Sequence, residues 1–449
     1  MTSTPQTGTG RPASDDGATR AESEVVDLCR DLIRIDTSNY GDGSGPGERQ
    51  ASEHVMTLLD EVGLTGELIE SDPGRASVVL RVEGTEPSRD ALLVHGHLDV
   101  VPARAADWQV DPFAGEERDG CLWGRGAVDM KGMDAMMLAV LRDMTRAGRK
   151  PPRDIVFAFL ADEEAGGVKG GHHLVAHRPE LFDGVTEAIS EVGGFSIDVE
   201  GQRCYLVQTA EKGIQWLRLV AHGRAGHGSQ VATDNAVTHL CEAVARIGSH
   251  EWPIEVTPTV RQFLDGIGEI TGTELDPNDF EQLEAVLGTT ARWVGATLRN
   301  TTNPTVLEAG YKHNVVPGTA TALIDTRFLP GREEELLAGV RELAGDRVEV
   351  EVVHRDVALQ TDLEGSLPDA MVAALLAEDP GAKVLPYCLS GGTDNKSFSL
   401  LGIRGFGFAP LRLPADLDFS GMFHGIDERV PTDALQFGTR VLDRLLRTC

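Results

Sequence analysis

KGMDAMMLAVLRDMTRAG, residues 131–148, determines the class of fold. Apolar residues recur in it at intervals of three and four, which predicts an amphipathic helix whose methionines pack into a core. Short apolar runs at 91–94 and 155–160 flank this stretch and resemble buried strands, and a similar run lies at 76–82. A further helix is predicted to begin at Ser23, a suitable N-cap residue. Strands that alternate with helices predict an α/β fold with a mostly parallel sheet flanked by helices.

The pattern changes from about residue 212 onward. The stretches GIQWLRLVAH (213–222) and ATALIDTRF (320–328) alternate between apolar and polar residues. VEVEVV (348–353) likewise places Val348, Val350 and Val352 on one face and glutamates on the other. Strands with one polar face are typical of a smaller, largely antiparallel α+β module.

We therefore predict that the chain has four segments. Residues 1–22 read as a disordered N-terminal arm, because they lack the apolar core of a signal peptide. Residues 23–211 and 358–449 form the α/β domain, in which the alternation of helix and buried strand resumes after the module. Residues 212–357 form a domain inserted into it. Pro, Gly and helical patches at 251–300 predict an insertion that enlarges this second domain.

Composition limits the classes of partner. The chain of 449 residues carries 41 Lys and Arg against 71 Asp and Glu, a formal net charge of −30. So acidic a surface repels phosphate backbones and argues against nucleic acid as a partner. Its six cysteines are scattered without a CxxC pair, which suits free thiols in a reducing cytoplasm. No apolar run is long enough to cross a bilayer, so we expect a cytoplasmic location and no membrane partner.

Two segments with metal-binding residue types directly follow predicted strands. The first is HGHLDVVP (95–102), in which His97 is the candidate ligand and Asp99 could fix the tautomer of its imidazole. His95 points to the same side of the strand and remains an alternative. The second is ADEEAGG (161–167), where adjacent carboxylates at a strand end suggest a neighbouring cation, although a solvated loop is the usual place for such a run.

Two further candidates stand in turns. Asp129 lies in WGRGAVDMKG, just ahead of the methionine-rich helix, where, taken alone, it is better explained as an N-cap residue. His424 lies in SGMFHGIDERVP, where a structural role is as reasonable for a single histidine. Taken together, two histidines and several carboxylates at strand and turn ends are the ligand types of a hydrolytic zinc site or a two-metal site.

The segments HLDVVP, WGRGAVDMKG, ADEEAGG, SEVGG and FHGIDERVP occur in this order along the chain. Together they resemble the M20 family of metallopeptidases and deacylases, which includes glutamate carboxypeptidase, aminoacylase, succinyl-diaminopimelate desuccinylase and acetylornithine deacetylase. The resemblance covers nearly the whole chain from about residue 23. It implies an amide-bond hydrolase with an α/β catalytic domain and an inserted lid domain.

The resemblance also implies two zinc ions per subunit, with cobalt or manganese as alternatives because the same ligands accept several divalent ions. His97 and Glu191 would bind one ion. Glu164 and His424 would bind the other, and Asp129 would bridge the two. Without the resemblance, nothing in the sequence would single out Glu191.

Two neighbours of these ligands take part in the expected chemistry. Asp99 would orient His97. Glu163, adjacent to a ligand, would act as the general base that takes a proton from the attacking water and passes it to the leaving nitrogen.

Substrate contacts are implied by three further motifs. AHGRAGHGSQ resembles a lid motif in which a histidine, here His227, reaches the substrate of the partner subunit. HNVVPGTATALIDTRF suggests Asn314 and Arg327, and Arg327 could pair with a substrate carboxylate. SGGTDNK suggests that Gly391 and Gly392 let backbone amides approach the substrate. A histidine donated in this way implies a homodimer formed through the inserted domain.

The expected substrate is a small peptide or an N-acyl amino acid with a free carboxylate. The family's aminopeptidases tend to carry Asp at the position of Glu191, so its Glu favours carboxypeptidase-, dipeptidase- or deacylase-like activity. The alternative is a biosynthetic deacylase of an N-acetyl or N-succinyl amino acid. A relative that has lost catalysis is disfavoured because Glu163 and the ligands are all present.

Overall fold

The computed structural model describes residues 20–288 and 290–449. Most of the predicted N-terminal arm therefore lies outside the described residues. Residues 20–22, which we assigned to that arm, already belong to helix α1 (Arg20–Ile33). The prediction that Ser23 caps this helix is wrong, because Ser23 lies within it and its hydroxyl donates a hydrogen bond of 2.8 Å to the carbonyl of Arg20.

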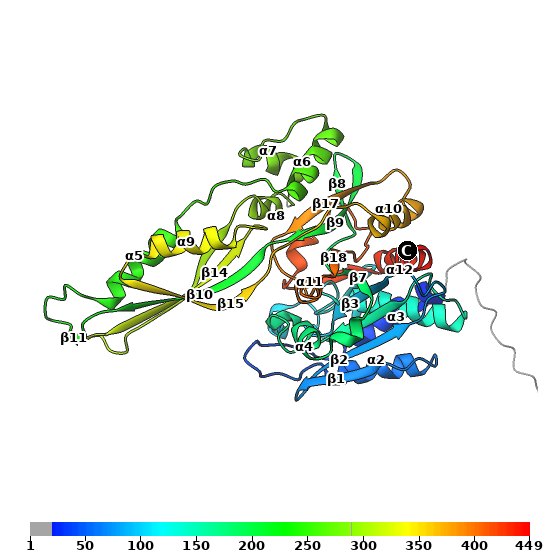
Figure 1. The fold of residues 1–449 in the computed structure, drawn as a ribbon, viewed down its shortest axis with the longest axis horizontal. Helices are drawn as coiled ribbons and strands as arrows, with labels where there is room; N and C mark the ends of the chain where they lie inside the picture. The colour runs from blue at the N-terminus through cyan, green and yellow to red at the C-terminus, as the bar shows by residue number, and fades with distance from the viewer. Residues whose placement is uncertain (1–19, 289) are drawn as a thin grey trace, which may run out of the picture.

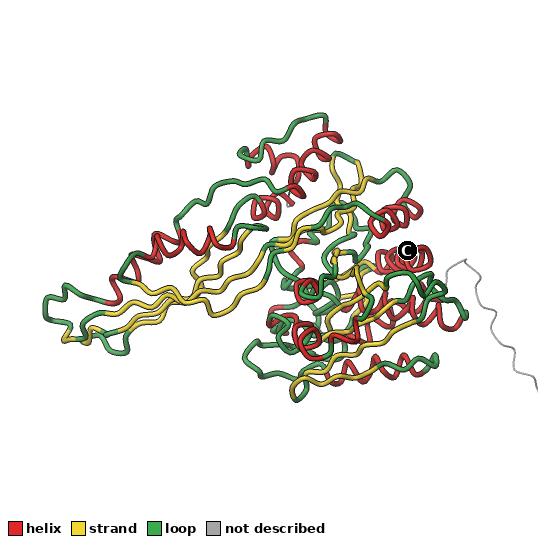
Figure 2. The backbone as a smooth tube through the Cα atoms, viewed as in Figure 1, coloured by secondary structure: helices red, strands yellow, loops and turns green. Residues whose placement is uncertain are grey.

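A ten-stranded sheet forms the centre of the larger domain (Figures 1 and 2). Its four middle strands run parallel, as the sequence predicted. Toward both edges the pairings are antiparallel, apart from one parallel pairing on the side of β9. The parallel strands are, in spatial order, β6 (Ile155–Leu160), β3 (Ala91–His97), β7 (Val185–Ser190) and β18 (Arg404–Gly407). The outer strands are β1 (Glu67–Asp72) and β2 (Arg75–Val82) on one side and β9 (Gln202–Glu211), β16 (Leu359–Gln360), β17 (Lys383–Leu389) and β8 (Phe195–Val199) on the other.

Both faces of this sheet are buried, which explains the uninterrupted apolar runs of its strands. Along β6, Phe157 and Phe159 belong to the large core on one face, whereas Ala158 and Leu160 belong to the core on the other. The large core includes residues of α1 and α3, and α12 packs against both of these helices. The flanking helices are α2 (Arg49–Asp60), α3 (Lys131–Arg146), α10 (Ser366–Glu378) and α12 (Thr432–Thr448) with the large core, and α4 (Gly171–His177) and α11 (Asn395–Ser399) with the other.

The methionine-rich helix is confirmed as core packing. It is α3, and its apolar stripe is buried between the sheet and the neighbouring helices α1 and α12. Met136 and Met137 are at most 1% exposed. The alternative use of Asp129 as an N-cap is not observed, since Met130 occupies that position and makes no side-chain capping bond.

The inserted domain is built on a separate four-stranded antiparallel sheet, which extends away from the α/β domain (Figure 1). Its strands, in spatial order, are β12 (Thr301–Ala309), β14 (Thr319–Phe328), β10 (Gly213–His222) and β15 (Val348–Asp356). Helices α5 (Ala236–Gly248) and α9 (Glu333–Ala344) share a second core with one face of this sheet. The strict alternation predicted for β15 fails at Val352, which is 41% exposed, because the pairing with β10 shifts register beside it.

Residues 251–300 do not enlarge the inserted domain as we expected. Their helices are α6 (Pro258–Thr271), α7 (Phe280–Leu287) and α8 (Thr290–Thr297). Both α6 and α8 pack against β17 of the central sheet, and their apolar residues join the large core of the α/β domain. Apolar residues such as Phe263 are therefore buried against the α/β domain. This helical segment (residues 251–300) follows α5 of the inserted domain directly in sequence, but its helices pack on the other domain, whereas Trp252 belongs to the core of the inserted domain.

Small elements complete the structure. A three-stranded sheet carries the turn before α3 and consists of β4 (Glu116–Arg118), β5 (Cys121–Trp123) and β19 (Arg429–Pro431). A two-stranded ribbon of β11 (Gly226–His227) and β13 (Val315–Val316) lies at the far tip of the inserted domain (Figure 1). In the part of the chain that the structure describes, no helix is both long and apolar enough to traverse a lipid bilayer.

Candidate metal centre

Three parallel strands end at the same edge of the central sheet and bring acidic and histidine side chains together there. His97 is the last residue of β3, Glu163 and Glu164 lie in the turn after β6, and Glu191 follows β7. Side chains at the carboxyl ends of neighbouring parallel strands lie close together, which is where open α/β sheets bind their ligands.

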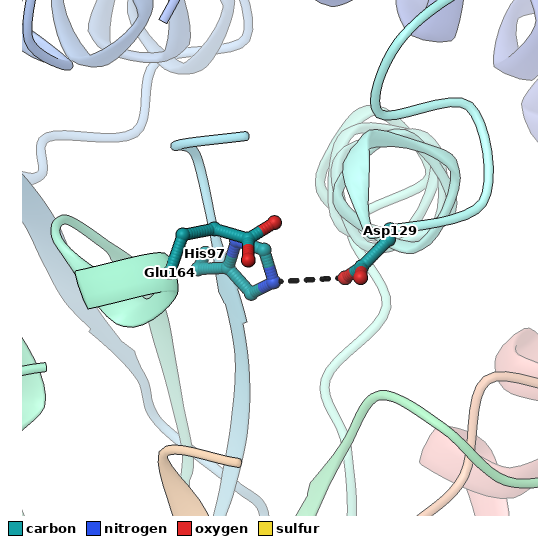
Figure 3. Close-up of side chains that lie close together, drawn as sticks. All are labelled: His97, Asp129 and Glu164. Atoms are coloured by element: carbon teal, nitrogen blue, oxygen red, sulfur yellow. Dashed lines mark hydrogen bonds and ion pairs between the residues drawn. The ribbon is translucent and has the colours of Figure 1, made fainter. Parts of the chain in front are cut away.

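Asp129 stands between the two histidines of this cluster. Its Oδ1 atom lies 3.1 Å from Nε2 of His97, and its Oδ2 atom lies 3.4 Å from Nε2 of His424. Glu164 lies close to His97 and Asp129 (Figure 3), and its Oε2 atom is 3.0 Å from Nε2 of His424. Each oxygen of the Asp129 carboxylate thus faces a different histidine. A carboxylate that bridges two metal ions needs this arrangement.

A second group of donors surrounds the other side of His97. Its Nε2 atom lies 3.6 Å from Oε2 of Glu191 and 3.8 Å from Oε2 of Glu163. Two sets of three donor atoms, each within 4.8 Å of one another, share His97: one with Asp129 and Glu164, the other with Glu163 and Glu191. The donor set of imidazole nitrogens and carboxylate oxygens fits hydrolytic divalent metal ions, zinc among them.

The electrostatics of the cluster also fit a cation. Burial, reinforced by nearby Glu191, raises the pKa of Glu163 well above its usual value. Burial also raises the pKa of Glu191 to about 8. Contacts with Asp129 and Glu164 raise the pKa of His424 to about 10. Several ionised carboxylates in one buried site are unfavourable unless positive charge lies beside them. The raised pKa values mean that protons supply this charge, and bound cations would take their place.

Asp99 organises this cluster differently from our expectation. The Nδ1 atom of His97 makes its hydrogen bond of 2.9 Å with the main-chain carbonyl of Asp99, whereas the carboxylate is 3.6 Å away. That carboxylate instead accepts backbone N–H bonds of 3.1 Å from both Glu163 and Glu164. Asp99 thus fixes the imidazole through its backbone and the acidic turn through its side chain.

Comparison with known proteins identifies the family. The model of peptidase family M20/M25/M40 matches residues 93–448, most of the chain. The chain belongs to this family. As an M20 family member it is a hydrolase that acts on amide bonds.

The relatives of this M20 chain include acylases and peptidases. It is 28% identical over 440 residues to aminoacylase-1 of Homo sapiens, with 95% of each chain covered. It is also 28% identical over 444 residues to the N-fatty-acyl-amino acid synthase/hydrolase PM20D1 of Xenopus tropicalis, covering 93% of this chain and 84% of that one. Among solved structures, the M20 family metallo-carboxypeptidase Sso-CP2 from Sulfolobus solfataricus aligns with a TM-score of 0.73 at 19% identity, covering 95% of this chain and 99% of that one. Human carnosine dipeptidase 1 aligns with a TM-score of 0.68 at 16% identity, covering 95% and 96%.

A cavity of about 450 Å³ opens over the cluster of this M20 chain. Among the residues predicted from sequence, the following line it: Asp129, Glu163, Glu164, Glu191, Arg327, Gly391, Gly392 and His424. His97 lies beneath its floor, since it is 1% exposed and contacts Asp129.

Arg327 reaches this cavity from β14 of the inserted domain. Its guanidinium is held by Asp325 through bonds of 2.7 and 2.9 Å from Nε and Nη2. His227 and Asn314 are not brought to the cavity. Both are exposed beside each other at the distal ribbon, where the N–H of Gly228 bonds the carbonyl of Asn314. A role for either in catalysis requires a second subunit and remains a prediction.

Histidine 95, the alternative to His97, is outside the cluster. Its ring contacts the hydroxyl of Ser190 at 3.2 Å and the amide oxygen of Asn395 at 3.0 Å. Burial lowers its pKa to about 4, so it is a neutral residue of the core.

Sequence reasoning missed Glu428, a buried residue that supports the turn carrying Asp129. Its Oε1 atom accepts N–H bonds of 2.7 Å from Val128 and 3.0 Å from Asp129. Its Oε2 atom accepts bonds of 2.9 Å from Gly126 and 2.7 Å from the guanidinium of Arg125. The available signal was its place in the motif FHGIDERVP, from which only His424 was singled out.

Asn39 was also missed. Its amide donates 2.9 Å and 3.1 Å bonds to the carboxylates of Asp99 and Asp162, which ties the loop after α1 to the acidic turn. A single Asn in a polar stretch far from every motif carries no sequence signal for such a role.

Proposed function

We propose that this protein is a dinuclear zinc hydrolase that cleaves the amide bond of N-acyl amino acids. The observation that carries the proposal is the position of Asp129, with one oxygen toward His97 and the other toward His424. His97 and Glu191 would hold one ion, Glu164 and His424 the other, and Asp129 both. Bound zinc would supply a Lewis acid and lower the pKa of a water molecule.

Glu163 is the proposed general base. Its side chain lines the cavity next to the cluster, with Oε2 at 3.8 Å from Nε2 of His97. There it can take a proton from the attacking water as the tetrahedral centre forms, and then return that proton to the leaving nitrogen. Its raised pKa fits a group that must hold the proton between the two steps.

The substrate would be oriented by its carboxylate. Arg327 offers a guanidinium whose plane Asp325 fixes, which suits pairing with a planar carboxylate. Gly391 and Gly392 line the same cavity and lack side chains that would keep the substrate from the backbone. An N-acyl amino acid meets these requirements, and the similarity to aminoacylase-1 supports this class.

A second candidate is a dipeptidase or carboxypeptidase, which the similarity of fold to Sso-CP2 and carnosine dipeptidase 1 favours. Such a substrate also has a carboxylate beside an amide. Deacylation of an acetylated or succinylated biosynthetic intermediate is a narrower form of the first proposal.

The proposal includes a cytoplasmic homodimer. The exposed ribbon that carries His227 lies far along the inserted domain from the metal centre (Figure 1). A partner subunit would have to place His227 and Asn314 over the cavity. The substitution H227A should then lower activity in a dimer without changing the metal content.

A substrate panel tests the function. The zinc-loaded protein should hydrolyse N-acyl amino acids faster than dipeptides that carry the same C-terminal residue, and a chelator should abolish both activities. Faster turnover of the dipeptides would favour the second candidate. Hydrolysis of neither class, with zinc bound, would contradict the proposed function.

A further inference from the structure

Two cationic side chains line the active-site cavity. Arg327 lines it, and so does Lys396, whose Nζ atom donates a hydrogen bond of 2.7 Å to the carbonyl of Lys212. A Cβ atom on Gly392 would lie 2.8 Å from that Nζ atom, so the ammonium group lies directly against the glycine loop. Arg327 from the inserted domain and Lys396 from α11 of the α/β domain are the cationic groups that could receive the carboxylate of the substrate, although the carboxylates Asp356 and Asp394 line the same cavity.

Aromatic side chains also line the cavity. Trp293 and Phe423 line it, with their ring centroids 5.9 Å apart and their planes 69° from parallel. Behind them, Phe419 packs against Phe423 at 5.3 Å, and Phe195 packs edge-on to Trp293 at 5.9 Å. This aromatic wall (Trp293 and Phe423) continues at the metal centre, because Phe423 directly precedes the proposed ligand His424.

Trp293 also separates the active-site cavity from another cavity. That second cavity has a volume of about 460 Å³ and is lined by residues 285–288 and 414–420, among others. Trp293 and Ser420 line both cavities. Trp293 belongs to α8 of the helical segment (residues 251–300), which packs on the α/β domain. This segment therefore supplies the side chain that lies between the two cavities.

We propose that the aromatic wall binds an apolar acyl group of the substrate and that Trp293 limits the length of that group. This rests on the proposed function: with the carboxylate at Arg327 and Lys396 and the amide at the metal centre, the acyl group is left to face Trp293 and Phe423. A succinyl group would place a second carboxylate against the apolar rings of Trp293 and Phe423. Burying that charge without a cationic partner is unfavourable. An acetyl group would leave the wall uncovered.

A series of N-acyl derivatives of one amino acid tests the proposal. For the zinc-loaded wild type, kcat/KM should rise from the acetyl derivative by about fourfold for each methylene group that contacts the wall, and then fall once the chain meets Trp293. In W293A the maximum should move to longer chains, because the two cavities join. The ratio of kcat/KM for the dodecanoyl derivative to that for the hexanoyl derivative should increase by about tenfold or more.

Phe280→Ala is the matched control. Phe280 belongs to the same helical segment and lies against Gly295 of α8, but it is 46% exposed and outside both cavities. F280A should keep the wild-type preference for chain length. An equal shift in F280A and W293A would mean that loosening of the segment causes the effect, and would overturn the assignment of Trp293.

The outcomes separate this proposal from the proposed function. If the wild type hydrolyses no member of the series, the proposed function fails. If it hydrolyses them but prefers acetyl or succinyl groups, or if W293A leaves the chain-length profile unchanged, the function stands and the acyl pocket is overturned.

Discussion

The carboxylate of Glu428 accepts a hydrogen bond of 3.0 Å from the backbone N–H of Asp129. Glu428 is fully buried, and it also accepts bonds from Val128, Gly126 and Arg125. The turn that presents the carboxylate of Asp129 is therefore fixed by a residue from the C-terminal part of the chain. Glu428 is not among the residues that line the cavity, so we expect it to act by positioning Asp129.

Glu428→Gln should weaken metal binding. One oxygen of the carboxylate becomes an NH₂ group that faces N–H donors, so the turn shifts and Asp129 moves with it. We expect metal affinity to fall by about 10- to 100-fold, as for other residues that orient ligands. Competition with a chelating dye measures it. Excess zinc should restore much of the activity, and Glu378→Gln, which removes a carboxylate paired with Arg440 and Arg444, is the control that should retain wild-type affinity.

Glu163→Gln should lower the rate of hydrolysis without weakening metal binding. The amide cannot accept the proton from water, so kcat should fall by about 100- to 10,000-fold while the metal content stays unchanged. Glu164→Gln, one residue along, should instead reduce metal content. Wild-type turnover by a metal-loaded E163Q protein would remove Glu163 from the role of base.

Metal affinity should rise with pH. The metal-free site holds protons at neutral pH, because the pKa of His424 is about 10 and that of Glu191 is about 8. A metal ion must displace these protons, so lowering the pH favours the protonated, metal-free form and raising it through 8 toward 10 favours the bound form. Titration calorimetry at pH 7 in buffers of different ionisation enthalpy should detect proton release. Binding without proton release would contradict these protonation states.

Met136→Ala should destabilise the fold without touching the site. Met136 is 1% exposed in the large core, and a Cβ on Gly438 of α12 would lie 2.4 Å from its sulfur. The loss of packing should cost about 2–5 kcal/mol of the free energy of unfolding. The melting temperature measures this loss. An unchanged melting temperature would show that the methionine stripe is not core packing.

Periodicity predicted strands in both domains because its rules are local. Alternation at 320–328 and the buried run at 155–160 each follow from which faces of a strand are covered. The position of residues 251–300 could not be predicted in this way. Phe263 and its neighbours require burial, but nothing in their own pattern says which of two domains provides it.

The candidate site shows the same limit. His97 and Glu164 drew attention because they follow buried strands, whereas Glu191 required the family resemblance. Glu428 and Asn39 act through hydrogen bonds to distant backbone and side-chain groups, which depend on the folded arrangement. Asp99 was identified from the sequence. That its carbonyl contacts His97 while its carboxylate accepts a bond from the N–H of Glu163 could be recognised only in the folded structure.

Metal stoichiometry tests the two-metal centre most directly. Zinc measured by mass spectrometry in the reconstituted wild-type protein should reach two ions per chain, and Asp129→Ala should lose tight binding of both, because Asp129 faces both histidines. One ion per chain in the wild type, or two tightly bound ions in D129A, would contradict a centre bridged by Asp129.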